Sequence, residues 1–270
     1  MSAGARRVAF VALLVCATTL TLCFLTLPVV AIFVDAGPAE LLVSLDDPVA
    51  VDALRLSLET TLIAIAIIVA AGTPAAYFLA TRDFPGRAVV LTLVELPLIL
   101  PPAAAGIGLL AALGPEGIIG PALGDLGIEL PLTTAGVVVA LVFVSSPFYV
   151  RQAQAAFGAL DRDLVAASRT LGASEARTFA RVAIPLALPS LGTGLALAWG
   201  RALGEFGATL MFAGSFRGVT QTAPLAIFER FATDFTAALA LSAVLVAASA
   251  ALLLVVKLLV ARGAGTHALA

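Results

Sequence analysis

Long apolar runs separated by short polar segments dominate this chain. Each run has enough residues to cross, as a helix, the roughly 30 Å hydrocarbon layer of a membrane, although the fourth run is short. Backbone groups in lipid must find their hydrogen bonds within the segment, so runs of this length predict membrane-spanning helices. The six predicted spans are residues 8–33, 56–80, 88–113, 133–150, 182–206 and 237–260.

The first run also invites a second interpretation, that of a secretory signal peptide. The apolar core of a signal peptide has about 7–15 residues. The run from 8 to 33 has 26 residues. We therefore expect a retained first span rather than a cleaved leader.

The composition agrees with a membrane protein. Hydrophobic residues make up 61% of the 270 residues, charged residues make up 12%, and the mean hydropathy is +1.11. A soluble domain of this size would need a larger polar surface. The net charge of −2 provides no basic surface for nucleic acid, so nucleic-acid binding is excluded.

The basic residues are distributed unequally between the two sides of the predicted membrane. With the N-terminus inside, the positions that fall outside or within the membrane are Arg55, Arg201, Arg217 and Arg230. The positions that fall inside are Arg6, Arg7, Arg82, Arg87, Arg151, Arg162, Arg169, Arg177, Arg181, Lys257 and Arg262. Basic loop residues stay on the cytoplasmic side, so both termini are expected there and the acidic loops are expected outside.

The chain contains no recognisable site for an energy source. A nucleotide-binding P-loop needs a Lys after its Gly-rich turn, and the only Lys is Lys257, in an apolar run. The only His is His267, in the C-terminal tail, which argues against a His-based metal site. Glu59 and Glu95 are isolated carboxylates in different spans, which gives little support to an enzyme. If ATP and Mg²⁺ are used, a partner protein must bind them.

Residues 160–189 form the longest polar interruption in the second half of the chain. Asp161 is placed to cap a helix that Gly172 would end, and Ser174 can cap a second short helix with Glu175 in its first turn. Apolar residues spaced four, three and four apart share one face of the first helix: Leu160, Leu164, Ala167 and Leu171. The pattern predicts a helix, a glycine turn and a helix outside the membrane.

Charged residues inside the spans indicate a transport pathway, because such residues usually face the protein interior or water. The candidates for a pathway or gate are Glu95, Arg201, Glu205 and Thr209. Arg201 and Glu205 are four residues apart, and we favour a structural ion pair over direct contact of Arg201 with a transported anion, because Glu205 would repel an anion.

Two further features of the spans concern helix geometry. Gly200 and Gly204 form a small-xxx-small pattern that predicts close helix packing. In the third span, Pro97, Pro101 and Pro102 predict a broken helix, as either a static kink or a gate hinge.

The 160–189 segment resembles the cytoplasmic signature loop of binding-protein-dependent ABC importer permeases. That signature reads Glu-Ala-Ala, three residues, Gly, nine residues and Ile-x-Leu-Pro. Here Ala166, Ala167 and Ser168 are followed by Gly172 and, after nine residues, by the segment 182–185. Spacing is kept throughout, while Ala166 replaces the signature Glu and Ser168 replaces the second Ala.

Other segments resemble the molybdate and sulfate branch of that family. RALGEFGATLMFAG at 201–214 and TQTAPLAIF at 220–228 are most similar to molybdate permeases. The resemblance implies an all-α integral membrane protein of six transmembrane helices with the type I ABC importer permease architecture. Residues 54–261 would form the permease core, preceded by residues 1–53, with the first span and an external loop, and followed by a cytoplasmic tail, 262–270.

The resemblance also implies partners and a function. Two copies of the chain would pair with two cytoplasmic ATPase subunits that bind ATP and Mg²⁺, and a periplasmic or lipid-anchored binding protein would deliver molybdate. The coupling loop at 160–182 would dock on the ATPase. Its coupling residues, taken together with the proline that follows the loop, would be Asp163, Ala166, Ala167, Ser168, Arg169, Gly172 and Pro185. The alternatives are a sulfate or tungstate permease and an ion-coupled secondary transporter.

Overall fold

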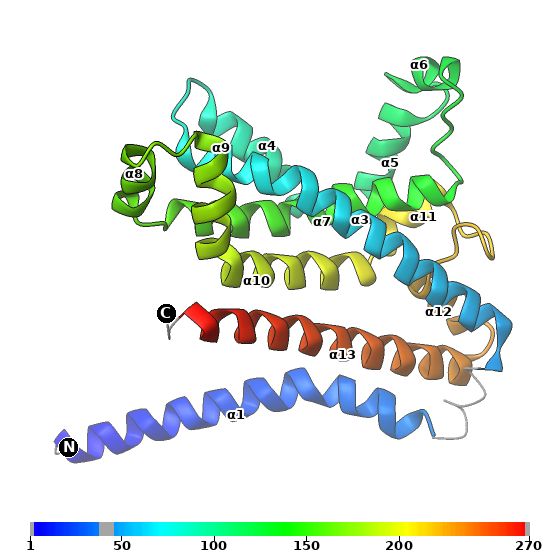
Figure 1. The fold of residues 1–270 in the computed structure, drawn as a ribbon. Helices are drawn as coiled ribbons and strands as arrows, with labels where there is room; N and C mark the ends of the chain where they lie inside the picture. Colours follow the sequence, from blue (N-terminus) through cyan, green and yellow to red (C-terminus); the bar gives the residue numbers. More distant parts are fainter. Residues whose placement is uncertain (1–2, 38–45, 268–270) are drawn as a thin grey trace.

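The computed structural model describes residues 3–37 and 46–267, and the described residues fold into helices joined by turns (Figure 1). The elements are α1 (Ala3–Asp35), α3 (Pro48–Thr81), α4 (Arg87–Ile99), α5 (Pro102–Leu113), α6 (Gly120–Asp125), α7 (Thr134–Gly158), α8 (Arg162–Thr170), α9 (Glu175–Thr178), η1 (Phe179–Ala183), α10 (Ile184–Leu203), α11 (Gly207–Ala213), α12 (Ala223–Phe231) and α13 (Phe235–His267).

The predicted spans are present. Five continuous helical segments in the described chain are long and apolar enough to cross a membrane, and α4 with α5 makes a sixth if the bent pair counts as one span. The all-helical membrane fold expected from the hydropathy pattern is confirmed.

The third span is broken more sharply than a kink. The axes of α4 and α5 differ by 119°. Leu100 ends α4 in an extended conformation, which is the conformation that a following proline imposes. Pro101 and Pro102 then start α5 without backbone N–H groups of their own. Pro97, in contrast, lies within α4, so the prediction of a break is confirmed only at the Pro101–Pro102 pair.

Two helices extend beyond their apolar runs. The prediction placed the fourth span at 133–150, yet α7 continues to Gly158 through a polar last section. Helix geometry likewise continues from α9 through η1 to the end of α10, so that the fifth span begins at Glu175 rather than at 182. Hydropathy marks the part of a helix that lies in lipid, whereas the backbone hydrogen bonds continue past it.

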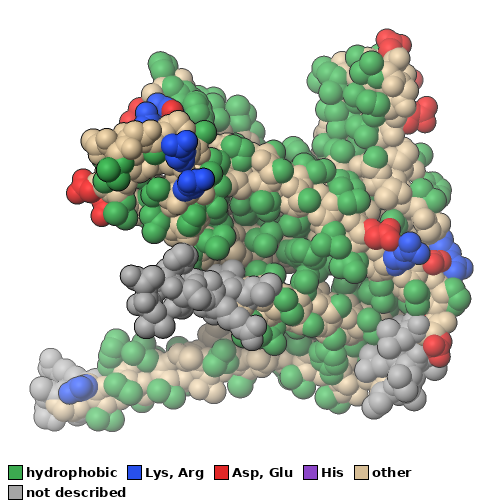
Figure 2. Space-filling model, in the orientation of Figure 1, with side chains coloured by type: hydrophobic (Ala, Val, Ile, Leu, Met, Phe, Trp, Pro, Cys, Tyr) green, Lys and Arg blue, Asp and Glu red, His purple; other side chains and the backbone are tan. Residues whose placement is uncertain are grey.

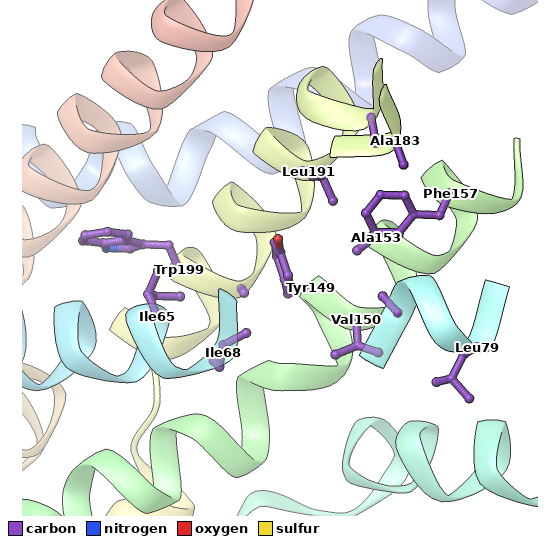
Figure 3. Packing of buried hydrophobic residues seen from close by; sticks show 13 residues of the cluster. Ile65, Ile68, Leu79, Tyr149, Val150, Ala153, Phe157, Ala183, Leu191 and Trp199 are labelled. Carbon is purple, nitrogen blue, oxygen red and sulfur yellow. The ribbon is translucent and has the colours of Figure 1, made fainter. Parts of the chain in front are cut away.

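The core lies where α3, α7 and α10 pack together (Figure 3). Gly72 of α3 allows a close approach to α7, because a Cβ there would lie 3.1 Å from the ring of Tyr149. One residue further, the Thr73 and Tyr149 hydroxyls form a buried hydrogen bond of 2.7 Å. Trp199 of α10 packs in the same apolar cluster. This packing holds α10, which carries the predicted pathway residue Arg201, against the other two helices.

Helix α1 lies along α13 at the side of the bundle (Figure 1). Its apolar side chains are exposed along nearly the whole described length. A helix with this surface is suited to contact with lipid or with another membrane helix.

Candidate coupling surface and transport pathway

The 160–189 segment forms the predicted pair of short helices at one end of the bundle (Figure 1). The Asp161 carboxylate accepts a hydrogen bond from the Asp163 N–H at 2.8 Å and caps α8. The Ser174 hydroxyl accepts one from the Arg177 N–H at 3.3 Å and caps α9. Both predicted N-caps are confirmed.

Gly172 ends α8 as predicted and reverses the chain. Its φ of +83° lies in the left-handed region that side chains other than glycine's rarely adopt. The Ala173 N–H donates to the Ser168 carbonyl at 3.1 Å, and the Gly172 N–H donates to the Arg169 carbonyl at 3.0 Å. These two bonds define a Schellman motif, which satisfies carbonyl groups at the helix end.

Helix α8, the turn at Gly172 and helix α9 form a hairpin, called the coupling hairpin below, whose apolar residues are largely exposed. Leu171, at the turn, has 88% of its surface exposed and Leu164 has 49%. Leu160 precedes α8 and packs against the core, so its predicted place on the helix is wrong. An almost fully exposed Leu at a turn outside the apolar bundle offers apolar area that a protein partner can bury.

Five of the predicted coupling residues lie on α8. The side chains of Asp163, Ala166, Ala167 and Arg169 are exposed, and Ser168 is half-buried. The Ser168 hydroxyl lies 3.0 Å from the fully buried hydroxyl of Thr178, within hydrogen-bonding distance. This bond joins α8 to α9, so the residue that departs from the signature has a structural role in this chain.

An ion pair that the sequence analysis missed connects the hairpin to the α3–α4 loop. The Arg82 guanidinium donates to the Glu175 carboxylate, and Arg169 lies 4.0 Å from the other carboxylate oxygen. Figure 2 shows basic side chains gathered at this end of the molecule. Arg82 and Glu175 are 93 residues apart in the sequence, so no local pattern could have paired them.

Pro185 lies immediately after a turn of π-helix. Because Pro185 has no backbone N–H, it cannot donate to Arg181, four residues before it. The Ile184 N–H instead reaches back five residues to the Phe179 carbonyl, and η1 is the resulting π turn. The predicted signature proline therefore follows a local widening inside the helical segment that runs from Glu175 to Leu203.

Glu95 pairs with a basic residue on another helix, so its description as an isolated carboxylate is wrong. The Glu95 carboxylate of α4 lies 2.8 Å from the Arg151 guanidinium of α7. Glu59 is also paired, with Arg55 one turn earlier in α3 at 2.7 Å. The spacing of four residues in the sequence indicates the pair of Arg55 with Glu59. The pair of Glu95 with Arg151 instead depends on how α4 and α7 pack.

The predicted ion pair between Arg201 and Glu205 is confirmed, with Nη2 and Oε2 2.5 Å apart. Glu205, however, lies beyond the end of α10 rather than within it. Its other oxygen, Oε1, accepts a hydrogen bond from the Ala208 N–H in the first turn of α11 at 2.7 Å. The carboxylate therefore joins two helices at a backbone break and is 1% exposed.

The other predicted residues in this region separate into buried and exposed positions. Thr209 in α11 is fully buried, and its hydroxyl has no hydrogen-bond partner among the described residues. Gly200 and Gly204 are exposed instead. A Cβ at Gly200 would meet no described atom within 4 Å, and one at Gly204 would meet only the carbonyl of its own helix. The prediction of close helix packing at Gly200 and Gly204 is therefore wrong within one subunit.

Ion pairs also tie the opposite end of the bundle together. The Asp47 carboxylate caps α3 by accepting from the Val49 N–H at 2.9 Å, and it pairs with Arg230 of α12. Partial burial alone would raise the pKa of Asp47, but the bonds from Val49 and Arg230 outweigh it and hold that pKa below its ordinary value. Arg217 pairs with Asp52 at 3.2 Å in the same region.

No group of three or more His, Cys, Asp or Glu side chains converges as a metal site in the described part of the chain. The 160–189 segment instead has the chemistry of a docking surface, and the region of Arg201 and Glu205 has that of paired charges within a bundle.

The fold and both regions define a membrane-embedded transport subunit. Residues 72–263 match the family described as the binding-protein-dependent transport system inner membrane component. The chain belongs to this family of inner membrane permease components.

Particular relatives narrow the comparison. The chain is 41% identical to the molybdenum transport system permease protein ModB of Mycobacterium bovis, over 86% of this chain and 88% of that protein. It is 37% identical to a probable sulfate transport system permease protein, cysT, of Chlorokybus atmophyticus, over 77% and 73% of the two chains. A bacterial ABC transporter that imports alginate has a similar fold, with a TM-score of 0.77, 15% identity and coverage of 95% and 96%.

Proposed function

We propose that the chain is the membrane-spanning subunit of an ATP-driven importer for molybdate. The similarity to ModB over most of both chains supports molybdate as the substrate. Sulfate, which the weaker match to cysT brings into consideration, is the runner-up, together with tungstate. In this proposal the chain is not itself an enzyme, and a separate ATPase binds ATP and Mg²⁺ and supplies the energy.

The observation that carries this proposal is the coupling hairpin. It combines a rigid glycine turn, an exposed Leu171 and surrounding charged residues, all at one end of the bundle. An ATPase that buries this hairpin can bias the bundle between two conformations, which is alternating access driven by a partner. The excess of basic residues supports a cytoplasmic position for this end and for both termini.

The proposed assembly contains two copies of the chain, two ATPases and one external binding protein. The face of α10 with Gly200 and Gly204 would be oriented toward the second copy, because a Cβ at Gly200 would meet no described atom within 4 Å. The opposite end, with its acidic segments, would receive the binding protein. The family's dependence on a binding protein supports that partner.

Reconstitution in liposomes tests this function. The purified chain, its ATPase and a binding protein loaded with molybdate, tungstate or sulfate are compared for uptake and for stimulated ATP hydrolysis. We expect ATP-dependent uptake to be strongest with molybdate. Stronger uptake of sulfate would contradict the substrate, and uptake driven by an ion gradient without the ATPase would contradict the class of transporter.

A further inference from the structure

One face of the second half of α10 and of Gly204 after it is open. Thr193, Leu197, Gly200 and Gly204 are all exposed, and their spacing of four, three and four residues places them on one side of a helix. Arg201 lies at the edge of this face, four residues after Leu197, and is 26% exposed. The glycines leave the backbone around the guanidinium uncovered, because they carry no side chains.

The two charges of the Arg201–Glu205 pair differ in their access to this face. Glu205 is 1% exposed; its Oε1 accepts a hydrogen bond from the Ala208 N–H, and its Oε2 lies 2.5 Å from the Arg201 Nη2 as an ion pair without hydrogen-bonding geometry. Arg201 makes no other ion pair within the described chain, and a guanidinium has five N–H donors. The positive member of the pair therefore reaches the open face and the negative member does not.

A charge that partly faces lipid is costly, so a guanidinium on an open helix face within a span is expected to meet water, protein or an anion. None of the exposed residues of this face is acidic, so none of them can neutralise Arg201; they are Thr193, Leu197, Gly200 and Gly204. The planar fork of Arg suits the paired oxygens of an oxyanion.

We propose that Arg201 contacts the tetrahedral oxyanion as it passes along this face, with Glu205 holding the guanidinium in place. The proposal rests on the proposed function, since it assigns a contact residue to the same transport. The buried Glu205 also serves transport, because a shared guanidinium binds the anion weakly enough to release it, as conduction requires. With two copies of the chain, two such groups would face the pathway.

The test must separate an anion contact from an ion pair that only stabilises the fold. Removing Arg201 alone would leave Glu205 buried and unpaired, so the informative comparison is between Glu205→Gln and the double variant Arg201→Gln with Glu205→Gln. In both variants, the Gln amide oxygen can still accept from the Ala208 N–H. The two proteins therefore differ only at position 201, where a neutral amide replaces the guanidinium, and neither contains a buried carboxylate at 205.

Molybdate uptake is measured in liposomes containing the chain, its ATPase and the loaded binding protein. We expect Glu205→Gln to lower uptake, because the guanidinium is no longer held in place, and the double variant to fall at least about tenfold below Glu205→Gln, the effect of one charge-assisted hydrogen bond. Assembly with the ATPase and stimulated ATP hydrolysis should persist in both. Equal uptake by the two variants would overturn the anion contact while leaving the proposed function intact.

A conservative variant gives a second, independent measurement in case the double variant fails to assemble. Arg201→Lys keeps the positive charge and the pair with Glu205 but loses the planar fork. We expect the ratio of molybdate to sulfate uptake to change in this variant. A purely structural pair would leave that ratio unchanged, and this result would overturn the proposal. Absence of uptake of either anion by the wild-type chain would contradict the proposed function itself.

Discussion

The hydroxyl oxygens of Ser168 and Thr178 lie 3.0 Å apart across the turn of the coupling hairpin, and Thr178 is fully buried. Ser168 occupies a position where the family signature has Ala, so this link is a local property of the chain rather than of the signature. The hairpin is held by this bond, by the Schellman motif at Gly172 and by the ion pair of Arg82 with Glu175.

Replacing Ser168 with Ala should destabilise the subunit by about 1 kcal/mol, because the buried Thr178 hydroxyl loses its partner. Thermal unfolding of the purified protein in detergent measures the effect. The double variant Ser168→Ala with Thr178→Val should recover part of the loss, since no unpaired hydroxyl remains. If both proteins melt at the wild-type temperature, the bond does not stabilise the hairpin.

Replacing Gly172 with Val should strain the turn by about 1 kcal/mol or more, because a β-branched residue is disfavoured at its φ of +83°. We expect ATP hydrolysis to become uncoupled from uptake in the reconstituted complex. Gly158→Ala is the matched control, because a Cβ there meets nothing within 4 Å and its φ is not positive. Coupled transport by Gly172→Val would argue against the hairpin as the docking element.

Leu171→Asp should weaken binding of the ATPase without destabilising the subunit, because the side chain is 88% exposed. Burial of a Leu side chain at an interface contributes about 1.5–3 kcal/mol, so co-purification of the ATPase should fall at least tenfold. Leu126→Asp changes another exposed Leu, 74% exposed and far from the hairpin in sequence, and should leave co-purification unchanged. If the two variants co-purify equal amounts of the ATPase, Leu171 is not part of the docking surface.

Asp47→Asn should lower the stability of the subunit by about 1–2 kcal/mol at neutral pH, because a charge-assisted bond to Arg230 is lost. The folded pKa of Asp47 lies below its ordinary value, so the contribution of the carboxylate is present above about pH 3.9 and is lost as pH falls through the folded pKa. The difference in melting temperature between wild type and variant should therefore shrink below about pH 4.

The control for Asp47 is Asp52→Asn, which removes the pair with Arg217. Both partners of that pair are about half exposed, so the change should be small. A wild-type advantage over Asp47→Asn that persists at low pH would contradict a role for the charged carboxylate.

Local features of the hairpin could be predicted from the sequence. Asp161, Gly172 and Ser174 act through bonds to residues within a few positions, so their types and spacing were sufficient. Hydropathy likewise located the spans, because it depends on each segment alone.

Features that depend on packing could not be predicted. The pair between Glu95 and Arg151 joins two helices whose contact no local pattern specifies. Glu205 was expected within a helix, since a spacing of four residues does not reveal that α10 ends at Leu203. The exposed state of Gly200 and Gly204 was missed for a related reason, because a small-xxx-small pattern does not tell which subunit provides the facing helix.

Helical backbone continues from Glu175 through the π turn η1 to Leu203, and this helix changes direction between α9 and α10 (Figure 1). Within this described stretch, no loop separates the surface on which a partner could act from Arg201 near the other end of α10. A rotation imposed at α9 would therefore reach the charged group through the backbone of the helix itself.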